Sequence, residues 1–125
     1  MRVLLDTVTF IWCIGAPQRV SRKAIAAIES GGPVELSAIS VCEIAIKHSK
    51  GKLNFSKTNL LAGLDDLNAR VLAYTRDHAY ELFSLPHHHP DPFDRQIIAQ
   101  ALAEDVPVVT CDEQFRLYNG LTVIW

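Results

Sequence analysis

The sequence predicts an α/β domain built around a mostly parallel β-sheet. Segments typical of strands and segments typical of helices alternate along the whole 125-residue chain. The predicted strands are continuous apolar runs, which indicates that helices cover both faces of the sheet. Strands that are joined through helices pair in parallel by right-handed crossovers. No linker or change in composition divides the chain, so we expect one domain over residues 1–125.

The first half of the chain is predicted to contain two strands and four helices. Val3–Leu5 and Val34–Ser37 are short apolar runs of the kind that form buried strands. Ser21 and Ser56 can cap helix N-termini, and Gly31 to Pro33 ends the helix before the second strand. The expected elements are a strand at 3–5, a helix at 7–14, a helix at 21–29, a strand at 34–37, a helix at 40–48 and a helix at 56–68.

The second half is predicted to add three strands and three helices. Thr75 or Asp77 begins a helix that ends before Pro86. Asp91 followed by Pro92 is typical of a helix start, with an N-cap side chain and then a proline at the first helical position. The expected elements are a strand at 70–74, a helix at 75–85, a helix at 92–104, a strand at 106–110, a short helix at 113–118 and a strand at 122–124.

Acidic and basic residues nearly balance, since 14 acids and 12 bases give a net charge of −2. This charge excludes a general attraction to nucleic acid, so nucleic-acid binding would need a local patch. Two basic stretches are candidates for such a patch. The alternative is a solvated helix end, where cations suit the helix dipole. The basic residues are Lys47, His48, Lys50, Lys52 and Lys57 in one stretch, and Arg19, Arg22 and Lys23 in the other.

The sequence shows neither a membrane span nor a signal peptide. No apolar run approaches the roughly 20 residues that cross a bilayer. Asp6 interrupts the N-terminal apolar run, and no small-residue cleavage site follows it. We therefore expect a cytoplasmic protein with no membrane contact. Cys13, Cys42 and Cys111 are odd in number and far apart, which predicts buried apolar residues rather than disulfides or a metal site.

Four acids occur where an open α/β sheet places its functional sites, beyond the carboxyl ends of the strands. Asp6 ends the first strand, and Asp112 lies two residues past the fourth. Glu43 and Asp94 are predicted to lie in the first turns of two helices. A helix that leads back to a parallel strand begins at the carboxyl edge of the sheet. The four side chains are therefore expected to converge on one edge.

Each acid also has a structural interpretation. Ser40 and Glu43 match a capping box, and Asp94 suits the positive end of a helix. Asp112 can cap the last helix. Asp6 is the hardest to explain in this way, because a carboxylate at the end of an apolar strand is desolvated and needs a partner.

Carboxylates that converge need either protons or a cation among them. Two charges at ~4 Å repel by about 4 kcal/mol at an effective dielectric constant of 20. Oxygen ligands in a shallow site suit Mg²⁺ or Mn²⁺. Such an ion can support the attack of water on a phosphodiester, while a carboxylate accepts the proton.

Four stretches of the chain, taken together and in this order, resemble PIN-domain ribonucleases, specifically the VapC-type toxins of toxin–antitoxin pairs. They read "LLDTVTFIW", "SAISVCEIAIKHSKGKL", "HHHPDPFDRQIIAQAL" and "VPVVTCDEQFRLY". The resemblance implies a three-layer fold whose five parallel strands have the order 3-2-1-4-5. It also implies a Mg²⁺- or Mn²⁺-dependent endoribonuclease that hydrolyses RNA, forms a homodimer and is neutralised by a cognate antitoxin.

The resemblance also implies which residues form the active site. The family's acid triad falls on Asp6, Glu43 and Asp94, and its fourth acid on Asp112, with Thr110 beside it. One position departs from the pattern, because similar sequences often have histidine where this chain has Val8. The alternative is therefore a catalytically impaired PIN-fold module that binds RNA or a protein partner.

Four further features near these acids each allow two interpretations. Asp91 is interpreted as an N-cap, or as a ligand through a water molecule. Arg95 either pairs with an acid of the site or contacts an RNA phosphate. Lys47 either forms an i,i+4 pair with Glu43 or steers phosphate towards the acids. His87–His89 are expected to face solvent, with an approach of the last histidine to the site as the alternative.

A phospho-accepting receiver domain also places acids at the strand ends of a parallel sheet. It needs a lone aspartate after the third strand and a lysine after the fifth. This chain has Tyr74 and Thr75 after its third strand and no lysine after Lys57, which argues against that class.

Overall fold

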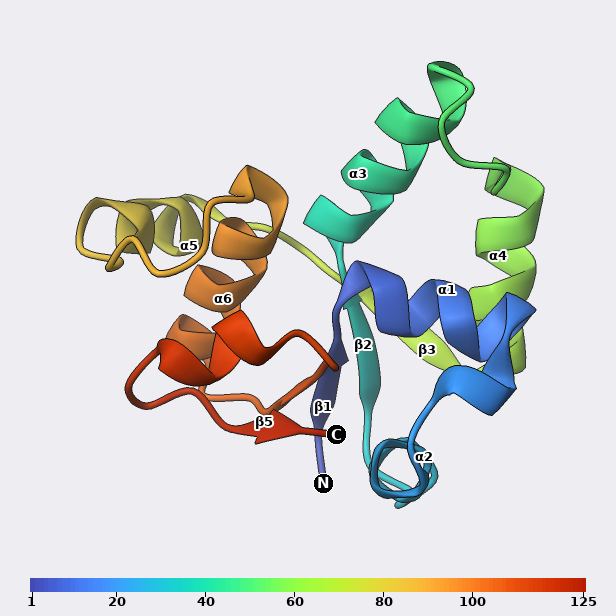
Figure 1. Cartoon of the computed structure of the whole chain (residues 1–125), viewed down its shortest axis with the longest axis horizontal. Helices are drawn as coiled ribbons and strands as arrows, with labels where there is room; N and C mark the ends of the chain where they lie inside the picture. Colours follow the sequence, from blue (N-terminus) through green and yellow to red (C-terminus); the bar gives the residue numbers. More distant parts are fainter.

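Five parallel strands run through the centre of the protein in the order β3-β2-β1-β4-β5 (Figure 1). The computed structural model describes all residues from 1 to 125. The predicted strand order and the expected parallel pairing are both confirmed. The strands are β1 (Val3–Leu5), β2 (Val34–Ser37), β3 (Ala69–Leu72), β4 (Val108–Val109) and β5 (Val123–Ile124).

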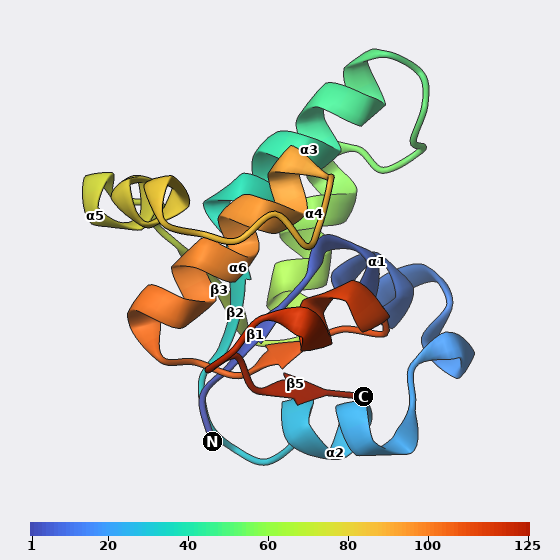
Figure 2. The ribbon, with the colours of Figure 1, turned by 60° about the vertical axis from the view of Figure 1, so that its left-hand side comes forward.

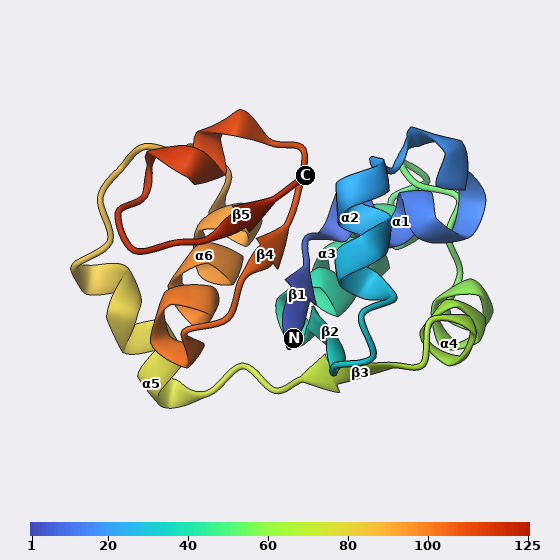
Figure 3. The same cartoon turned by 90° about the horizontal axis from the view of Figure 1, so that it is seen from below.

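Helices cover both faces of the sheet, so the molecule has three layers (Figures 1 and 3). One face carries α1, α2 and α4, and the other carries α5 and α6. Helix α3 begins at the carboxyl edge of the sheet and projects away from it (Figure 1). The α-helices are α1 (Thr7–Gly15), α2 (Arg22–Ile28), α3 (Ala38–Ser49), α4 (Lys57–Asp66), α5 (Arg76–Tyr80) and α6 (Pro92–Glu104), and the short 3-10 helices are η1 (Pro17–Arg19), η2 (Glu81–Phe83) and η3 (Glu113–Leu117).

The two faces of β1 contribute to two separate hydrophobic cores. Val3 and Leu5 pack with Phe10 of α1 in one core, whereas Leu4 packs with Ile97 of α6 in the other. All three residues of the strand are fully buried. Successive side chains of a strand point to opposite faces, so a strand covered on both faces must be apolar at every position. This explains the uninterrupted apolar run that predicted the strand.

The register of the central strands brings their carboxyl ends level with one another. Leu5 of β1 pairs with Leu36 of β2 and with Val109 of β4. Asp6 and Thr110, the residues that follow β1 and β4, therefore lie side by side at the same edge. Figure 2 shows α1, α3 and α6 beginning around this edge. No helix of the protein has the length and apolar character that a bilayer span requires.

Helix α3 begins two residues earlier than expected. Ser37 is its N-cap, and the Ser37 hydroxyl accepts a hydrogen bond from the backbone N–H of Ile39 at 3.0 Å. Ser40 instead accepts a hydrogen bond from the hydroxyl of Thr7 on α1. The capping-box interpretation of Glu43 is therefore wrong, and Glu43 lies in the second turn of α3. The N-cap lies earlier in the sequence than expected because β2 ends at Ser37, whose extended backbone suits an N-cap.

Several other helices and strands differ in their bounds from those predicted from the sequence. The predicted helix at 75–85 is divided into α5 and η2, and β4 and β5 have only two residues each. The prediction of buried cysteines is wrong for Cys42, which is exposed on α3, while Cys13 and Cys111 are half-buried. Cys42 is exposed because α3 packs against the body of the protein only along part of its surface.

A fully buried carboxylate in β2 stabilises the face of the sheet that α6 covers. Glu35 is 1% exposed and forms ion pairs with Arg2 and Arg70. Arg2 also pairs with Glu104 at the end of α6. Removing a buried hydrogen-bonding group is costly because it leaves other buried groups without a partner. Removing an exposed member of an ion pair changes the free energy of unfolding little.

We predict that Glu35→Gln lowers the free energy of unfolding by about 1–3 kcal/mol, because the buried amide nitrogen that replaces one carboxylate oxygen faces a guanidinium donor and has no acceptor. Arg70→Gln should cost at most ~1 kcal/mol, because Arg70 is exposed and Glu35 keeps Arg2. Chemical denaturation of the two variants measures the difference. Equal losses in both variants would contradict this view of Glu35.

Candidate metal centre

Asp6 lies at the centre of the carboxyl edge and is 3% exposed. One carboxylate oxygen caps α1 by accepting the backbone N–H of Thr9 at 2.9 Å. The other accepts the hydroxyl of Thr110 at 2.6 Å. Burial nevertheless raises the pKa of Asp6 above its usual range, although these hydrogen bonds oppose the rise. Asp6 is thus an oriented carboxylate whose negative charge lacks full compensation.

Glu43 brings a second buried carboxylate to the cluster from α3, where it is 6% exposed. Its Oε2 atom pairs with the ammonium group of Lys47 at 2.5 Å, which is the i,i+4 pair given as one of the two interpretations of Lys47. Its Oε1 atom is buried and has no hydrogen-bond partner. A buried oxygen of this kind is costly unless a donor or a cation satisfies it. It is therefore the clearest sign that the cluster accommodates a ligand.

Asp94 lies in the first turn of α6 and interacts electrostatically with the other acids. Its pKa is raised from 3.8 to about 7, mainly by burial and next by the negative charge of Asp91. His89 acts in the opposite direction, while Asp6 and Glu43 add to the rise. Residues from β1, α3 and α6 therefore act on one another at one edge of the sheet.

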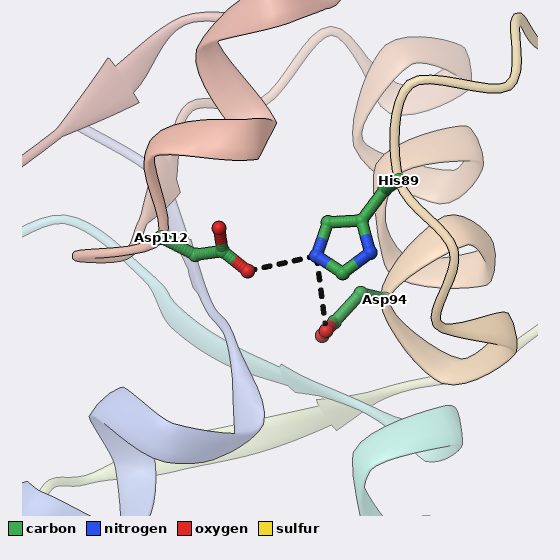
Figure 4. Close-up of side chains that lie close together, drawn as sticks. All are labelled: His89, Asp94 and Asp112. Carbon is green, nitrogen blue, oxygen red and sulfur yellow. Dashed lines mark hydrogen bonds and ion pairs between the residues drawn. The ribbon is translucent and has the colours of Figure 1, made fainter.

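Asp112 approaches Asp94 through a shared histidine (Figure 4). The Nε2 atom of His89 lies 2.7 Å from Oδ2 of Asp112 and 3.3 Å from Oδ2 of Asp94. The ligand atoms of these three residues lie within 4.8 Å of one another. The other oxygen of Asp112 caps η3 by accepting the backbone N–H of Gln114. Asp112 is thus a helix cap and a member of the acidic cluster at the same time.

Thr110 links the two ends of this cluster. Its hydroxyl donates to Asp6 and accepts the backbone N–H of Asp112 at 3.0 Å. This explains how a residue with no charge of its own can belong to the site.

Asp91 caps α6 by accepting the backbone N–H groups of Phe93 and Asp94, which confirms the N-cap interpretation.

Arg95 does not pair with an acid of the cluster. Its guanidinium donates to the carbonyl oxygens of Pro86 at 2.8 Å and Leu85 at 3.3 Å. Of the two interpretations of Arg95, the structure therefore does not support the ion pair, because adjacent helical residues are rotated by about 100° and Arg95 and Asp94 occupy different faces of α6. The pKa of Lys47 is raised by its hydrogen bond to Glu43 and, more weakly, by Asp91 and Asp94, which places its charge beside the cluster.

The expectation that the three histidines face solvent is correct for two of them. His87 and His88 are exposed, whereas His89 is buried and lies in the cluster. The sequence alone does not distinguish three consecutive histidines in a loop. Val8, where similar sequences often have histidine, is 44% exposed on the first turn of α1.

The residues of the cluster fit a divalent cation. Asp94 and Asp112 approach each other through His89, whereas Asp6 and Glu43 lie outside that group of three and interact with Asp94 electrostatically. Lys47 is the only lysine or arginine that pairs with any of the four carboxylates. The buried Oε1 of Glu43 has no other partner. Hard oxygen donors of this kind suit Mg²⁺ or Mn²⁺ rather than a thiolate-preferring metal. We therefore regard this edge as a candidate metal centre.

Comparison with known protein families identifies the fold family. The model of the PIN domain matches residues 3–121. The chain belongs to the PIN domain family. A comparison with curated protein sequences finds no match.

Solved structures with a similar fold include three toxin–antitoxin complexes. One is a chain of VapBC2 from Rickettsia felis, bound to a DNA fragment from its promoter, whose sequence is 18% identical to this one. The two structures align with a TM-score of 0.73, and the alignment covers 98% of this PIN domain chain and 97% of the other chain. A chain of DNA-bound VapBC from Salmonella typhimurium is 20% identical, with a TM-score of 0.73 and coverage of 98% and 96%. VapBC-5 from Mycobacterium tuberculosis is 19% identical, with a TM-score of 0.63 and coverage of 98% and 96%. At these identities the likeness establishes the shared fold.

We predict that, without divalent cations, this PIN domain becomes less stable as the pH rises from about 4 to about 7. The folded state holds a proton on Asp94 that the unfolded chain releases at lower pH, so the unfolded state binds fewer protons across this range. Thermal unfolding in EDTA measures the decline. Asp94→Asn should reduce it, and Asp65→Asn, at an exposed position on α4, should leave it unchanged. An unchanged decline in Asp94→Asn would contradict the raised pKa.

Proposed function

We propose that this PIN domain, taken as one unit over residues 1–125, is a divalent-metal-dependent endoribonuclease of the VapC toxin type. The observation that carries the proposal is the buried acidic cluster, in which Glu43 keeps an oxygen without a partner. Family membership supports nuclease chemistry in general. The resemblance in the four sequence motifs supports RNA as the substrate and Mg²⁺ or Mn²⁺ as the ion.

Asp6, Glu43, Asp94 and Asp112 are proposed as the metal-binding and catalytic residues. A divalent cation held there would activate water and stabilise the leaving oxygen of a phosphodiester. Thr110 orients Asp6, and the N-terminus of α1 fixes the other oxygen of the same carboxylate. The carboxylate of Asp112 is 32% exposed, so a substrate that arrives from solvent can reach it.

Two positive side chains are proposed to contact the RNA backbone. Lys47 is 43% exposed and lies beside the acids, so it can attract a phosphate to a site that is otherwise negative. Arg95 lies one residue from Asp94, but two carbonyl oxygens already hold its guanidinium. We therefore assign the larger contribution to Lys47. Asp91 remains a candidate to bind the cation through a water molecule.

A cognate antitoxin is the proposed protein partner. The structural relatives above are complexes of toxins with antitoxins, and the shared fold supports the same kind of partner here. We also propose a cytoplasmic homodimer on the basis of the motif resemblance. Co-expression with the product of the adjacent reading frame tests the partner, because a true antitoxin should co-purify and suppress RNA cleavage.

The direct test is cleavage of single-stranded RNA by the purified protein. We expect cleavage with Mn²⁺ or Mg²⁺ and its loss in EDTA. Asp6→Asn and Asp94→Asn should each reduce the rate at least about 100-fold, because each removes a charged oxygen from the cluster. Asp65→Asn, on an exposed face of α4, is the matched control and should keep full activity.

Full activity of Asp6→Asn would defeat this assignment. The alternative function is a module that binds RNA or protein without cleaving it, which the replacement of histidine by Val8 favours. That alternative predicts no RNA cleavage under any of these conditions and no Mn²⁺-induced thermal shift that depends on Asp6 and Asp94.

A further inference from the structure

His89 is the one buried histidine that touches the acidic cluster, and the proposed function does not yet use it. Its side chain is 5% exposed. Figure 4 shows the ring between Asp94 and Asp112, with its Nε2 atom directed towards both carboxylates. The inference drawn below rests on the proposed function, because it concerns the same carboxylates.

The loop that carries His89 is held in place by η3 and by α6. The hydroxyl of Tyr118, a buried residue, accepts the backbone N–H groups of His88 at 3.2 Å and His89 at 2.9 Å. Arg95 donates to two carbonyl oxygens at the start of the loop. The His89 ring also meets the ring of Phe115 edge to face, with centroids 5.6 Å apart. The position of the ring is therefore fixed by contacts outside the cluster.

A hydrogen bond on the far side of the ring determines which nitrogen carries the proton. The backbone N–H of Asp91 donates to Nδ1 of His89 at 3.1 Å, so Nδ1 must present a lone pair. A neutral ring with an unprotonated Nδ1 carries its proton on Nε2. Nε2–H then donates to Oδ2 of Asp112 at 2.7 Å, with Oδ2 of Asp94 at 3.3 Å as a second, weaker acceptor.

This proton arrangement makes His89 a donor to two carboxylates rather than a third metal ligand. If Nε2 bound a metal through its lone pair, the neutral ring would carry its proton on Nδ1, which already accepts the backbone N–H of Asp91. Although the three ligand atoms lie within 4.8 Å of one another, one of them is a donor facing two acceptors.

We propose that His89 is a positioning residue that holds Asp112 and Asp94 together through Nε2–H and does not bind the metal ion. It links the turn after β4 to the first turn of α6, two segments that supply acids to the same site. Each carboxylate keeps further oxygen lone pairs for a cation. Hydrogen-bond partners that orient metal ligands typically change metal affinity by about 10–100-fold when they are removed.

Nitrogen NMR of the histidine rings tests the arrangement without any RNA. In ¹⁵N-labelled protein at mildly alkaline pH, we expect His89 to show a protonated Nε2 and an unprotonated Nδ1. His89→Gln identifies its signals. Addition of Mg²⁺ should leave that proton in place. A proton on Nδ1, or loss of the Nε2 proton when Mg²⁺ binds, would overturn the proposal.

Variants separate a donor from a ligand. The amide nitrogen of His89→Gln can replace Nε2–H as a donor, so this variant should bind Mn²⁺ within a few-fold of the wild type. His89→Ala should bind about 10–100-fold more weakly, because it has no donor to hold the two carboxylates. His87→Gln, in the exposed part of the same loop, is the matched control.

Calorimetric titration of each variant with Mn²⁺ gives the affinities, and circular dichroism checks that each variant is folded. If His89 binds the ion, His89→Gln should lose as much affinity as His89→Ala, and that result would overturn the proposal. If the protein failed to cleave RNA, the NMR and titration results would still stand, so the two proposals fail separately.

Discussion

Negative charge gathered at the carboxyl edge of the sheet is the constraint on which the rest of the structure depends. Asp6 and Glu43 are almost fully buried, and Asp94 is raised in pKa to about 7 by burial and by neighbouring acids. Such a cluster is stable only if donors or cations face its oxygens. In this chain the N-terminus of α1, the hydroxyl of Thr110 and the ammonium group of Lys47 supply part of that compensation.

The parallel sheet explains why residues so distant in sequence share this edge. Strand β1 is central, with β2 and β4 as its neighbours, so the residues that follow these strands begin at the same level. Helices α1, α3 and α6 start around that edge: Asp6 caps α1, Asp94 lies in the first turn of α6, and Glu43 lies in the second turn of α3. The two hydrophobic cores behind the edge fix these helices against the sheet. The packing of these two cores therefore both stabilises the fold and sets the geometry of the site.

Much of the fold could be predicted from the sequence because it depends on patterns that are local. The apolar run Val3–Leu5 predicted a strand buried on both faces, and the carboxyl-edge rule predicted where Asp6 and Asp94 would lie. Predictions that depended on packing between distant segments were less accurate. The start of α3, the direction of Arg95 and the burial of His89 are set by β2, by the loop at 85–91 and by Tyr118, and none of these contacts leaves a periodic signal in the sequence.

The most direct test of the central claim is a crystal structure of the protein with Mn²⁺, in which anomalous scattering locates the ion. The account predicts Mn²⁺ at the carboxyl edge of the sheet, bound by oxygens of Asp6, Glu43 and Asp94 either directly or through water. An ion bound elsewhere, or carboxylates too far apart to share one ion even through water, would contradict the account.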